Sequence, residues 1–162
     1  MADILVTGGA GFIGSNFVRF WCERGNGGVV VLDALTYAGN PASIADVRGA
    51  ELVEGDICDT DLVRKLLRER AIRTIVHFAA ESHVDRSITG PDAFVRTNVV
   101  GTHSLLRAAK AEWLDGGEDG RPHRFHHVST DEVYGSLGPD DPPFAETTAY
   151  APNSPYSASK AG

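Results

Sequence analysis

The residues best suited to chemistry lie near the end of the chain, where a tyrosine and a lysine stand four positions apart. On a helix, Tyr156 and Lys160 share one face, and a nearby ammonium is expected to lower the pKa of the phenol. A phenol so placed can accept the proton of a substrate hydroxyl while hydride leaves the adjoining carbon. Because this spacing often occurs by chance, it gains meaning only from its neighbours.

A hydroxyl and two carboxylates precede that pair, in the loop Ser129-Thr130-Asp131-Glu132. Two adjacent carboxyl groups suit two different proton-transfer roles when their surroundings separate their affinities for a proton. The alternative interpretation is a solvated acidic loop, which is the common fate of such pairs. The position of this loop directly after an apolar run that ends at Val128 favours the catalytic interpretation.

A glycine-rich segment near the N-terminus indicates a dinucleotide-binding turn. Residues 7–14 read TGGAGFIG, in which Gly8, Gly11 and Gly14 follow an apolar run and open a helical pattern. Glycine permits a sharp turn and lets a pyrophosphate approach the N-terminus of the helix. A second apolar run ends at Asp33, about 20 positions further on, where an acidic residue binds ribose hydroxyls. Its charge would repel a 2′-phosphate, which predicts NAD rather than NADP; the alternative for Asp33 is a cap or turn residue.

Alternating strands and helices must position these residues. We expect strands over 4–6, 29–32, 51–54, 74–78 and 125–128, helices over 12–24 and 60–69, a long helix from 91, and a last helix from about 155. This alternation predicts an α/β fold with a doubly wound parallel sheet that stops after its fifth strand. Ligands of such sheets bind beyond the carboxyl ends of the strands, so the loops described above are expected to meet at one edge.

The spacing of apolar residues also predicts which helix faces turn inward. For the first helix these are Ile13, Phe17, Phe20, Trp21 and Arg24, and for the long helix Val95, Val99, Thr102, Leu105, Leu106 and Ala109. Asn98 lies on the inward side of the long helix, where a buried polar group needs a hydrogen-bond partner. Asp56 and Ile57 follow the third strand and are placed to meet an adenine, unless Gly55-Asp56 is only a turn.

Composition excludes several classes of function. A net charge of −7 over 162 residues argues against a nucleic-acid partner. The sequence shows no membrane-spanning run, no secretory signal and no disulfide framework, which together predict a cytoplasmic protein. Neighbouring strand residues point to opposite faces, so we expect no metal site at His123, His126 and His127.

Five segments together resemble one family. They are TGGAGFIGS (7–15), DALTYAGN (33–40), HFAAESHVDRSI (77–88), STDEVYG (129–135) and PYSASKAG (155–162). They resemble the dTDP-glucose 4,6-dehydratases, which belong to the extended short-chain dehydrogenase/reductases and have a Rossmann-type fold. The glycine turn and Y-x-x-x-K occur throughout those reductases. The T-D-E triplet is what distinguishes these dehydratases from sugar epimerases and from GDP-mannose dehydratases.

The resemblance implies a redox-neutral dehydration with NAD as cofactor. Tyr156 would take the proton of the glucose 4-hydroxyl as hydride passes from carbon 4 to NAD. Glu132 would remove the proton of carbon 5, and Asp131, protonated near neutral pH, would protonate the departing 6-hydroxyl before hydride returns to carbon 6. Thr130 would hold the 4-oxygen, and Lys160 would bind the nicotinamide ribose and tune Tyr156.

The resemblance also assigns binding residues. The NAD site would be lined by Gly8, Gly11, Phe12, Ile13, Gly14, Asp33, Ala34, Leu35, Thr36, Asp56, Ile57, Phe78, Ala79, Ala80, Glu81, Ser82, Thr97, Tyr156 and Lys160. Ser82 and Thr130 would touch the nucleotide-sugar substrate. The full-length enzyme is expected to be a homodimer, formed through the long helix and the helix that carries Tyr156.

Members of that family continue well beyond this length. We therefore expect residues 1–162 to be the NAD-binding domain without the lobe that binds the nucleotide sugar, inactive as a dehydratase and poorly stable on its own. Two other functions stay open: a 4-epimerase or UDP-sugar dehydratase, and a non-catalytic NAD-binding module. The Asp131-Glu132 pair argues against an epimerase, and its presence together with Tyr156 and Lys160 argues against a module without catalysis.

Overall fold

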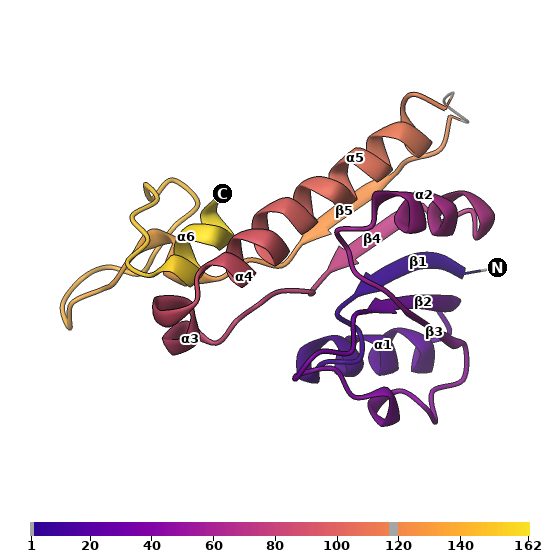
Figure 1. Ribbon diagram of the computed structural model, residues 1–162, viewed down its shortest axis with the longest axis horizontal. Coiled ribbons are helices and arrows are strands. Elements are labelled where there is room, and N and C mark those ends of the chain that lie inside the picture. The colour runs from indigo at the N-terminus through magenta and orange to yellow at the C-terminus, as the bar shows by residue number, and fades with distance from the viewer. Residues whose placement is uncertain (1, 117–119) are drawn as a thin grey trace. The chain divides into compact units, whose positions relative to one another are not determined.

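The computed structural model describes residues 2–116 and 120–162, and the chain divides into two compact units (Figure 1). The first unit comprises Met1–Ala79 and Gly101–Val128. The second comprises Ala80–Val100 and Ser129–Gly162. The dinucleotide turn therefore belongs to the first unit, and the residues predicted to be catalytic belong to the second.

The first unit is built on a parallel sheet of five strands in the order β3-β2-β1-β4-β5. The strands are β1 (Ala2–Thr7), β2 (Gly28–Asp33), β3 (Ala50–Glu54), β4 (Thr74–His77) and β5 (Arg124–His127). Strand order runs outward from β1 in both directions, through β2 on one side and β4 on the other. This confirms the predicted doubly wound, Rossmann-type fold, whose switch point lies at the carboxyl end of β1.

Helices cover both faces of this sheet. They are α1 (Phe12–Glu23), α2 (Thr60–Glu69) and α5 (Thr102–Trp113), and a short 3₁₀ turn (Pro41–Ser43) follows β2. Leu5 of β1 packs in one apolar cluster with α2 and α5, whereas its neighbours Ile4 and Val6 pack in a second cluster with α1. Each central strand is thus buried on both faces, which explains its continuous apolar sequence. No helix among the described residues has the length and apolar character needed to cross a membrane.

The predicted inward face of α1 is wrong in part. Ile13 and Phe20 are 64% and 49% exposed, and the helix buries Gly14, Ser15 and Val18 instead. The reason is close packing, since a Cβ on Gly14 would lie 2.2 Å from the carbonyl oxygen of Gly8. Only small side chains fit where the helix axis comes so near the turn. Arg24 is also exposed, whereas Phe17 and Trp21 pack against the sheet as expected.

The long helix expected from Pro91 forms, but its geometry changes along its length. A short α4 (Asp92–Phe94) leads into a π-helix (Val95–Gly101), which continues as α5. The buried positions include Phe94, Asn98 and Leu105, whereas Val95 and Leu106 of the predicted stripe are about half exposed. The spacing of apolar residues fits both the predicted inward face of this helix and the face that is buried in the structure. The polar Asn98 can occupy a buried position because its side chain is fully hydrogen-bonded.

The second unit consists of short helices and a long loop. Besides α4 it contains α3 (Val84–Thr89), a 3₁₀ helix (Asp131–Tyr134) and α6 (Pro155–Ala161). The apolar pattern predicted neither α3 nor the 3₁₀ helix, because each is too short to show a period. The loop before α6 is held by the ring of Tyr134, which packs against Phe144 and Tyr150 with centroids 5.3 and 5.4 Å away.

Candidate functional site

The glycine-rich turn makes the sharp connection between β1 and α1 that the sequence predicts. Gly8 has a φ of +70°, and a Cβ there would lie 2.6 Å from the backbone nitrogen of Ala79. Gly11 is the N-cap of α1, and no side chain caps the helix. The first N–H groups of α1 are therefore left to an outside acceptor, reached across a surface without Cβ atoms. This is the chemistry that a pyrophosphate requires.

Asp33, at the end of β2, is nearly buried and organises the turn beside it. Its Oδ2 accepts a hydrogen bond from the Ala10 N–H and its Oδ1 accepts one from the Leu35 N–H, both at 2.9 Å. Leu35 adopts a left-handed φ of 49°, which this second bond helps to hold. Asp33 thus acts as the turn residue that the sequence left as an alternative, and its bond to a ribose stays a prediction.

Other residues predicted to line the NAD site differ in the exposure of their side chains. Phe12, the first residue of α1, is exposed, and so are Ala34 and Thr36 on the loop that follows β2. The side chain of Ile57 is buried and packs where a Cβ on Gly101 would collide with it at 2.5 Å. The Ile57 side chain is therefore packed inside the first unit, and the proximity of Asp56 and Ile57 to an adenine stays a prediction.

A buried row of hydrogen bonds, which the sequence did not reveal, fixes the ends of β1 and β4. His77 Nδ1 lies 2.6 Å from Thr7 Oγ1, and its Nε2 lies 3.0 Å from Thr102 Oγ1. Thr7 Oγ1 also accepts from the N–H of Ala79 at 3.4 Å. The row holds the main chain of Ala79 against Gly8, so His77 has a structural role. A threonine at the end of a strand beside glycine is the only signal that could have indicated it.

The second unit gathers the residues predicted to act in catalysis. Thr130 caps the 3₁₀ helix, where its Oγ1 accepts from the Glu132 N–H at 3.3 Å. Helix α6 packs beside this 3₁₀ helix. The Tyr156 hydroxyl forms a hydrogen bond with the Thr130 side chain, and the Tyr156 ring lies edge-on to Phe94 at a centroid distance of 6.4 Å.

The electrostatic surroundings of the tyrosine differ from the expectation. Burial raises the pKa of the Tyr156 phenol, and the negative charges of Glu132 and Asp131 raise it further. The hydrogen bond with Thr130 opposes these effects but does not outweigh them. A phenol pKa lowered by Lys160 is therefore wrong for this chain by itself, because sequence spacing indicated neither the burial of the ring nor the charges of the two carboxylates.

Lys160 is buried, and this burial lowers its pKa to about 8. Its ordinary value of 10.5 applies to the unfolded chain, so between these two values the unfolded state binds more protons than the folded state. The contribution of Lys160 to stability should therefore rise with pH from about 8 upward. We expect the difference in unfolding temperature between wild type and Lys160→Met to grow in favour of wild type from pH about 8 to about 10.

The matched control for this prediction is Lys110→Met, at an exposed lysine that pairs with Asp115 at 2.8 Å. It should show no such trend, since an ion pair on the protein surface contributes little to stability. A pH-independent difference for Lys160→Met would contradict the prediction.

Asn98 has the partners that its buried position requires. Its Oδ1 accepts from the Glu81 N–H, and its Nδ2 donates to the Glu81 carbonyl oxygen, both at 2.9 Å. Nδ2 also donates to Ser159 Oγ at 2.8 Å. Asn98 thus holds the backbone of the segment 80–82, predicted to line the NAD site. The sequence did not single out Ser159, whose small polar side chain carries no signal of its own.

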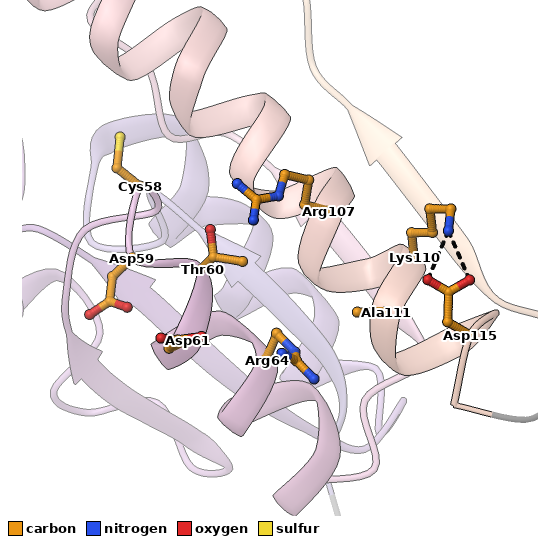
Figure 2. A pocket seen from close by; sticks show the side chains of 9 residues that line it. All are labelled: Cys58, Asp59, Thr60, Asp61, Arg64, Arg107, Lys110, Ala111 and Asp115. Atoms are coloured by element: carbon orange, nitrogen blue, oxygen red, sulfur yellow. Dashed lines mark hydrogen bonds and ion pairs between the residues drawn. The ribbon is translucent and has the colours of Figure 1, made fainter.

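A hollow of about 590 Å³ in the first unit lies between α2 and α5. Figure 2 shows Arg107 and Lys110 from α5 on one side and the residues from Cys58 to Arg64 on the other. Lys110 bonds to Asp115, and Arg64 bonds to Glu112 at 2.8 Å. The charged residues that line the hollow are the cations Arg64, Arg107 and Lys110 and the carboxylates Asp59, Asp61 and Asp115, so it presents no net charge that would select a ligand.

No group of three metal-binding side chains occurs in the part of the chain that the structure describes. His123 stacks on Trp113 at a centroid distance of 5.0 Å, and His126 is exposed.

The sequence pattern of the family described as GDP-mannose 4,6 dehydratase matches residues 5–162. The chain belongs to this family. Among its relatives in the family, dTDP-glucose 4,6-dehydratase of Xanthomonas campestris (strain B100) is 58% identical over 99% of the chain and 46% of the relative. dTDP-glucose 4,6-dehydratase 1 of Escherichia coli K12 is 53% identical over 98% of the chain and 47% of the relative. The chain spans about half the length of these relatives.

Solved structures agree with this assignment to the dehydratase family. The dTDP-glucose 4,6-dehydratase DesIV of Streptomyces venezuelae, solved with NAD and TYD bound, superposes with a TM-score of 0.84 at 50% identity, covering 98% of this chain and 48% of that one. The UDP-glucose 4-epimerase of Brucella ovis, solved with NAD, gives a TM-score of 0.82 at 33% identity, covering 99% of this chain and 45% of that one. The backbone alone therefore does not separate dehydratases from epimerases.

Proposed function

We propose that this chain is the NAD-binding part of a dehydratase that converts dTDP-glucose to dTDP-4-keto-6-deoxyglucose and water. The observation that carries the proposal is in the second unit, where the 3₁₀ helix with Asp131 and Glu132, capped by Thr130, packs beside the helix α6 that bears Tyr156. An alcohol oxidation needs only the tyrosine, whereas removal of water also needs a base for one carbon and an acid for the departing hydroxyl. Two carboxyl groups next to the phenol match this requirement.

In the proposed reaction, Tyr156 accepts the proton of the 4-hydroxyl and Thr130 holds the 4-oxygen. When bound, NAD accepts hydride from carbon 4 and returns it to carbon 6, so no net oxidation occurs. Glu132 removes the proton of carbon 5, which the 4-ketone has made acidic, and Asp131 gives its proton to the leaving 6-hydroxyl. Lys160 binds the nicotinamide ribose. The C6–O bond breaks as the C5–C6 double bond forms, and the hydroxyl leaves as water. When hydride then adds to carbon 6, Glu132 returns the proton to carbon 5, which completes the 4-keto-6-deoxy product.

The glycine turn and Asp33 support NAD as the cofactor. The Cβ-free surface around Gly8 and the uncapped start of α1 fit a pyrophosphate. The NAD-bound crystal structures of DesIV and of a Bacillus anthracis dTDP-glucose 4,6-dehydratase support the same cofactor here. We further propose that the whole enzyme carries a nucleotide-sugar lobe and forms a homodimer.

Turnover by the complete protein tests this function. We expect dTDP-glucose to give the 4-keto-6-deoxy product, identified by mass loss of one water, without net formation of reduced NAD. Interconversion of UDP-glucose and UDP-galactose with no loss of water would instead identify an epimerase. Binding of NAD with no turnover of either sugar nucleotide would identify a binding module.

Cofactor choice gives a separate prediction. A 2′-phosphate would meet the carboxylate of Asp33, and at a separation of ~4 Å such a repulsion amounts to several kcal/mol at a dielectric constant of ~20. We expect the Kd of NAD to be at least about tenfold lower than that of NADP. Calorimetric titration of both dinucleotides into the full-length protein measures this, and equal or tighter binding of NADP would contradict the role of Asp33.

A further inference from the structure

Helix α6 is tied to the rest of the second unit by a serine that the proposed mechanism does not use. Ser159 is only 6% exposed and lies between Tyr156 and Lys160 in the chain. Its hydroxyl donates to the carbonyl oxygen of Tyr156 at 2.7 Å and accepts from Asn98 Nδ2 at 2.8 Å. The same oxygen atom therefore contacts the main chain of the tyrosine and a side chain from the π-helix.

The asparagine at the other end of this bond has a single possible orientation. Its two Nδ2 protons go to Ser159 Oγ and to the Glu81 carbonyl oxygen, while Oδ1 accepts from the Glu81 N–H. Exchanging the oxygen and nitrogen of Asn98 would set a donor against the N–H of Glu81 and an acceptor against its carbonyl. The Asn98 side chain thus bonds to both the N–H and the carbonyl oxygen of Glu81. Its second Nδ2 proton forms the hydrogen bond to Ser159.

We propose that Ser159 is a positioning residue that sets Tyr156 relative to the Glu81 segment through Asn98. The proposal rests on the proposed function, in which the segment 80–82 lines the NAD site and Tyr156 takes the substrate proton. We call the bonded pair of side chains the Asn98–Ser159 latch. A buried network whose donors and acceptors are all satisfied is rigid, so the latch fixes the distance from the segment to the main chain of Tyr156.

The residue type supports this role. Helix α6 has only seven residues, and short helices are marginal without added contacts. Alanine favours a helix more than serine does and would fill a buried position without a polar group. A serine in this place is therefore unfavourable unless its hydroxyl is used, and both of its hydrogen bonds connect to residues of the proposed active site.

The test uses the full-length enzyme with NAD and dTDP-glucose. We expect Ser159→Ala to lower kcat by about ten- to a hundredfold while KM changes by less than about threefold, because a misplaced phenol affects the chemical step more than binding. The ionisation of Tyr156, followed by ultraviolet absorbance against a Tyr156→Phe background, should shift as well. Ser159→Thr should restore most of kcat, since a threonine hydroxyl in a helix can also bond to the carbonyl three residues earlier.

The matched control is Ser104→Ala, which removes another buried hydroxyl, bonded to Thr60 at 2.7 Å in the first unit. It should lower the unfolding temperature but leave kcat and the Tyr156 titration unchanged. If Ser159→Ala behaves in the same way as Ser104→Ala, the serine only stabilises the fold and the proposal is overturned.

A second variant keeps the proposal testable if Ser159→Ala does not fold. Asn98→Asp retains the acceptor for the Glu81 N–H but removes the donor to Ser159. It should show the same loss of kcat, and wild-type kcat in Asn98→Asp would overturn the latch. If the wild-type enzyme does not dehydrate dTDP-glucose, the proposed function fails, whereas the ultraviolet titration of Tyr156 in the Ser159 variants still decides the latch.

Discussion

Replacement of Glu132 by glutamine is expected to lower the rate of dehydration by about 10²–10⁴-fold, the usual contribution of a general base. Oxidation at carbon 4 does not need this carboxylate, so the reduced cofactor should accumulate on the full-length enzyme and appear in its absorbance. The same substitution removes a negative charge that raises the pKa of Tyr156. The pKa of that phenol should therefore fall in Glu132→Gln, which ultraviolet titration can measure.

Glu146→Gln is the matched control, since it makes the same chemical change at an exposed glutamate in the long loop of the second unit. It should leave dehydration, accumulation of reduced cofactor and the Tyr156 titration as in wild type. Dehydration at a near-normal rate in Glu132→Gln would show that a different group removes the proton from carbon 5.

Replacement of Gly8 by alanine should combine a backbone penalty with a collision. The φ of +70° costs an L-residue about 1–2 kcal/mol, and the contact of the new Cβ with Ala79 adds about 1–3 kcal/mol. We therefore expect a loss of stability of about 2–5 kcal/mol. The Kd for NAD should rise at least about tenfold, because the turn that admits the pyrophosphate can no longer close against β4.

Gly25→Ala separates the two contributions. Gly25 has nearly the same φ, +68°, but a Cβ there would meet no atom within 4 Å. This variant should lose only about 1–2 kcal/mol of stability and bind NAD as wild type does. Chemical denaturation and calorimetric titration of both variants give the comparison. Equal stability losses would mean that the approach of Gly8 to Ala79 is not a tight one.

The sheet could be predicted from the sequence because parallel strands buried on both faces have continuous apolar sequences, such as that of β2. The faces of the helices could not be predicted as well. Apolar spacing does not show that Gly14 draws α1 close to the turn, so that the large Ile13 and Phe20 stay in solvent. Nor does it reveal a π-helix, which depends on hydrogen bonds along the main chain rather than on a side-chain period.

The candidate site could likewise be predicted from the sequence only in part. Tyr156, Lys160 and the acid pair could be found because the spacing and residue types are those that proton transfer requires. The effect of Glu132 on the phenol depends on the folding of a 3₁₀ helix that no pattern indicated. Thr7 and Ser159 each act through two hydrogen bonds of a small side chain, and no sequence pattern indicates such bonds.

The double use of the Asp33 carboxylate has a consequence for how cofactor preference could evolve in such a chain. A mutation that removes its charge, in order to admit a 2′-phosphate, also removes at least one of the two acceptors that hold Ala10 and Leu35. The first mutant on that route would lose the shape of the turn before it gained a new ligand. A change of preference therefore requires a second mutation that supplies the lost acceptor, and the two must arise together or in the order that restores the acceptor first.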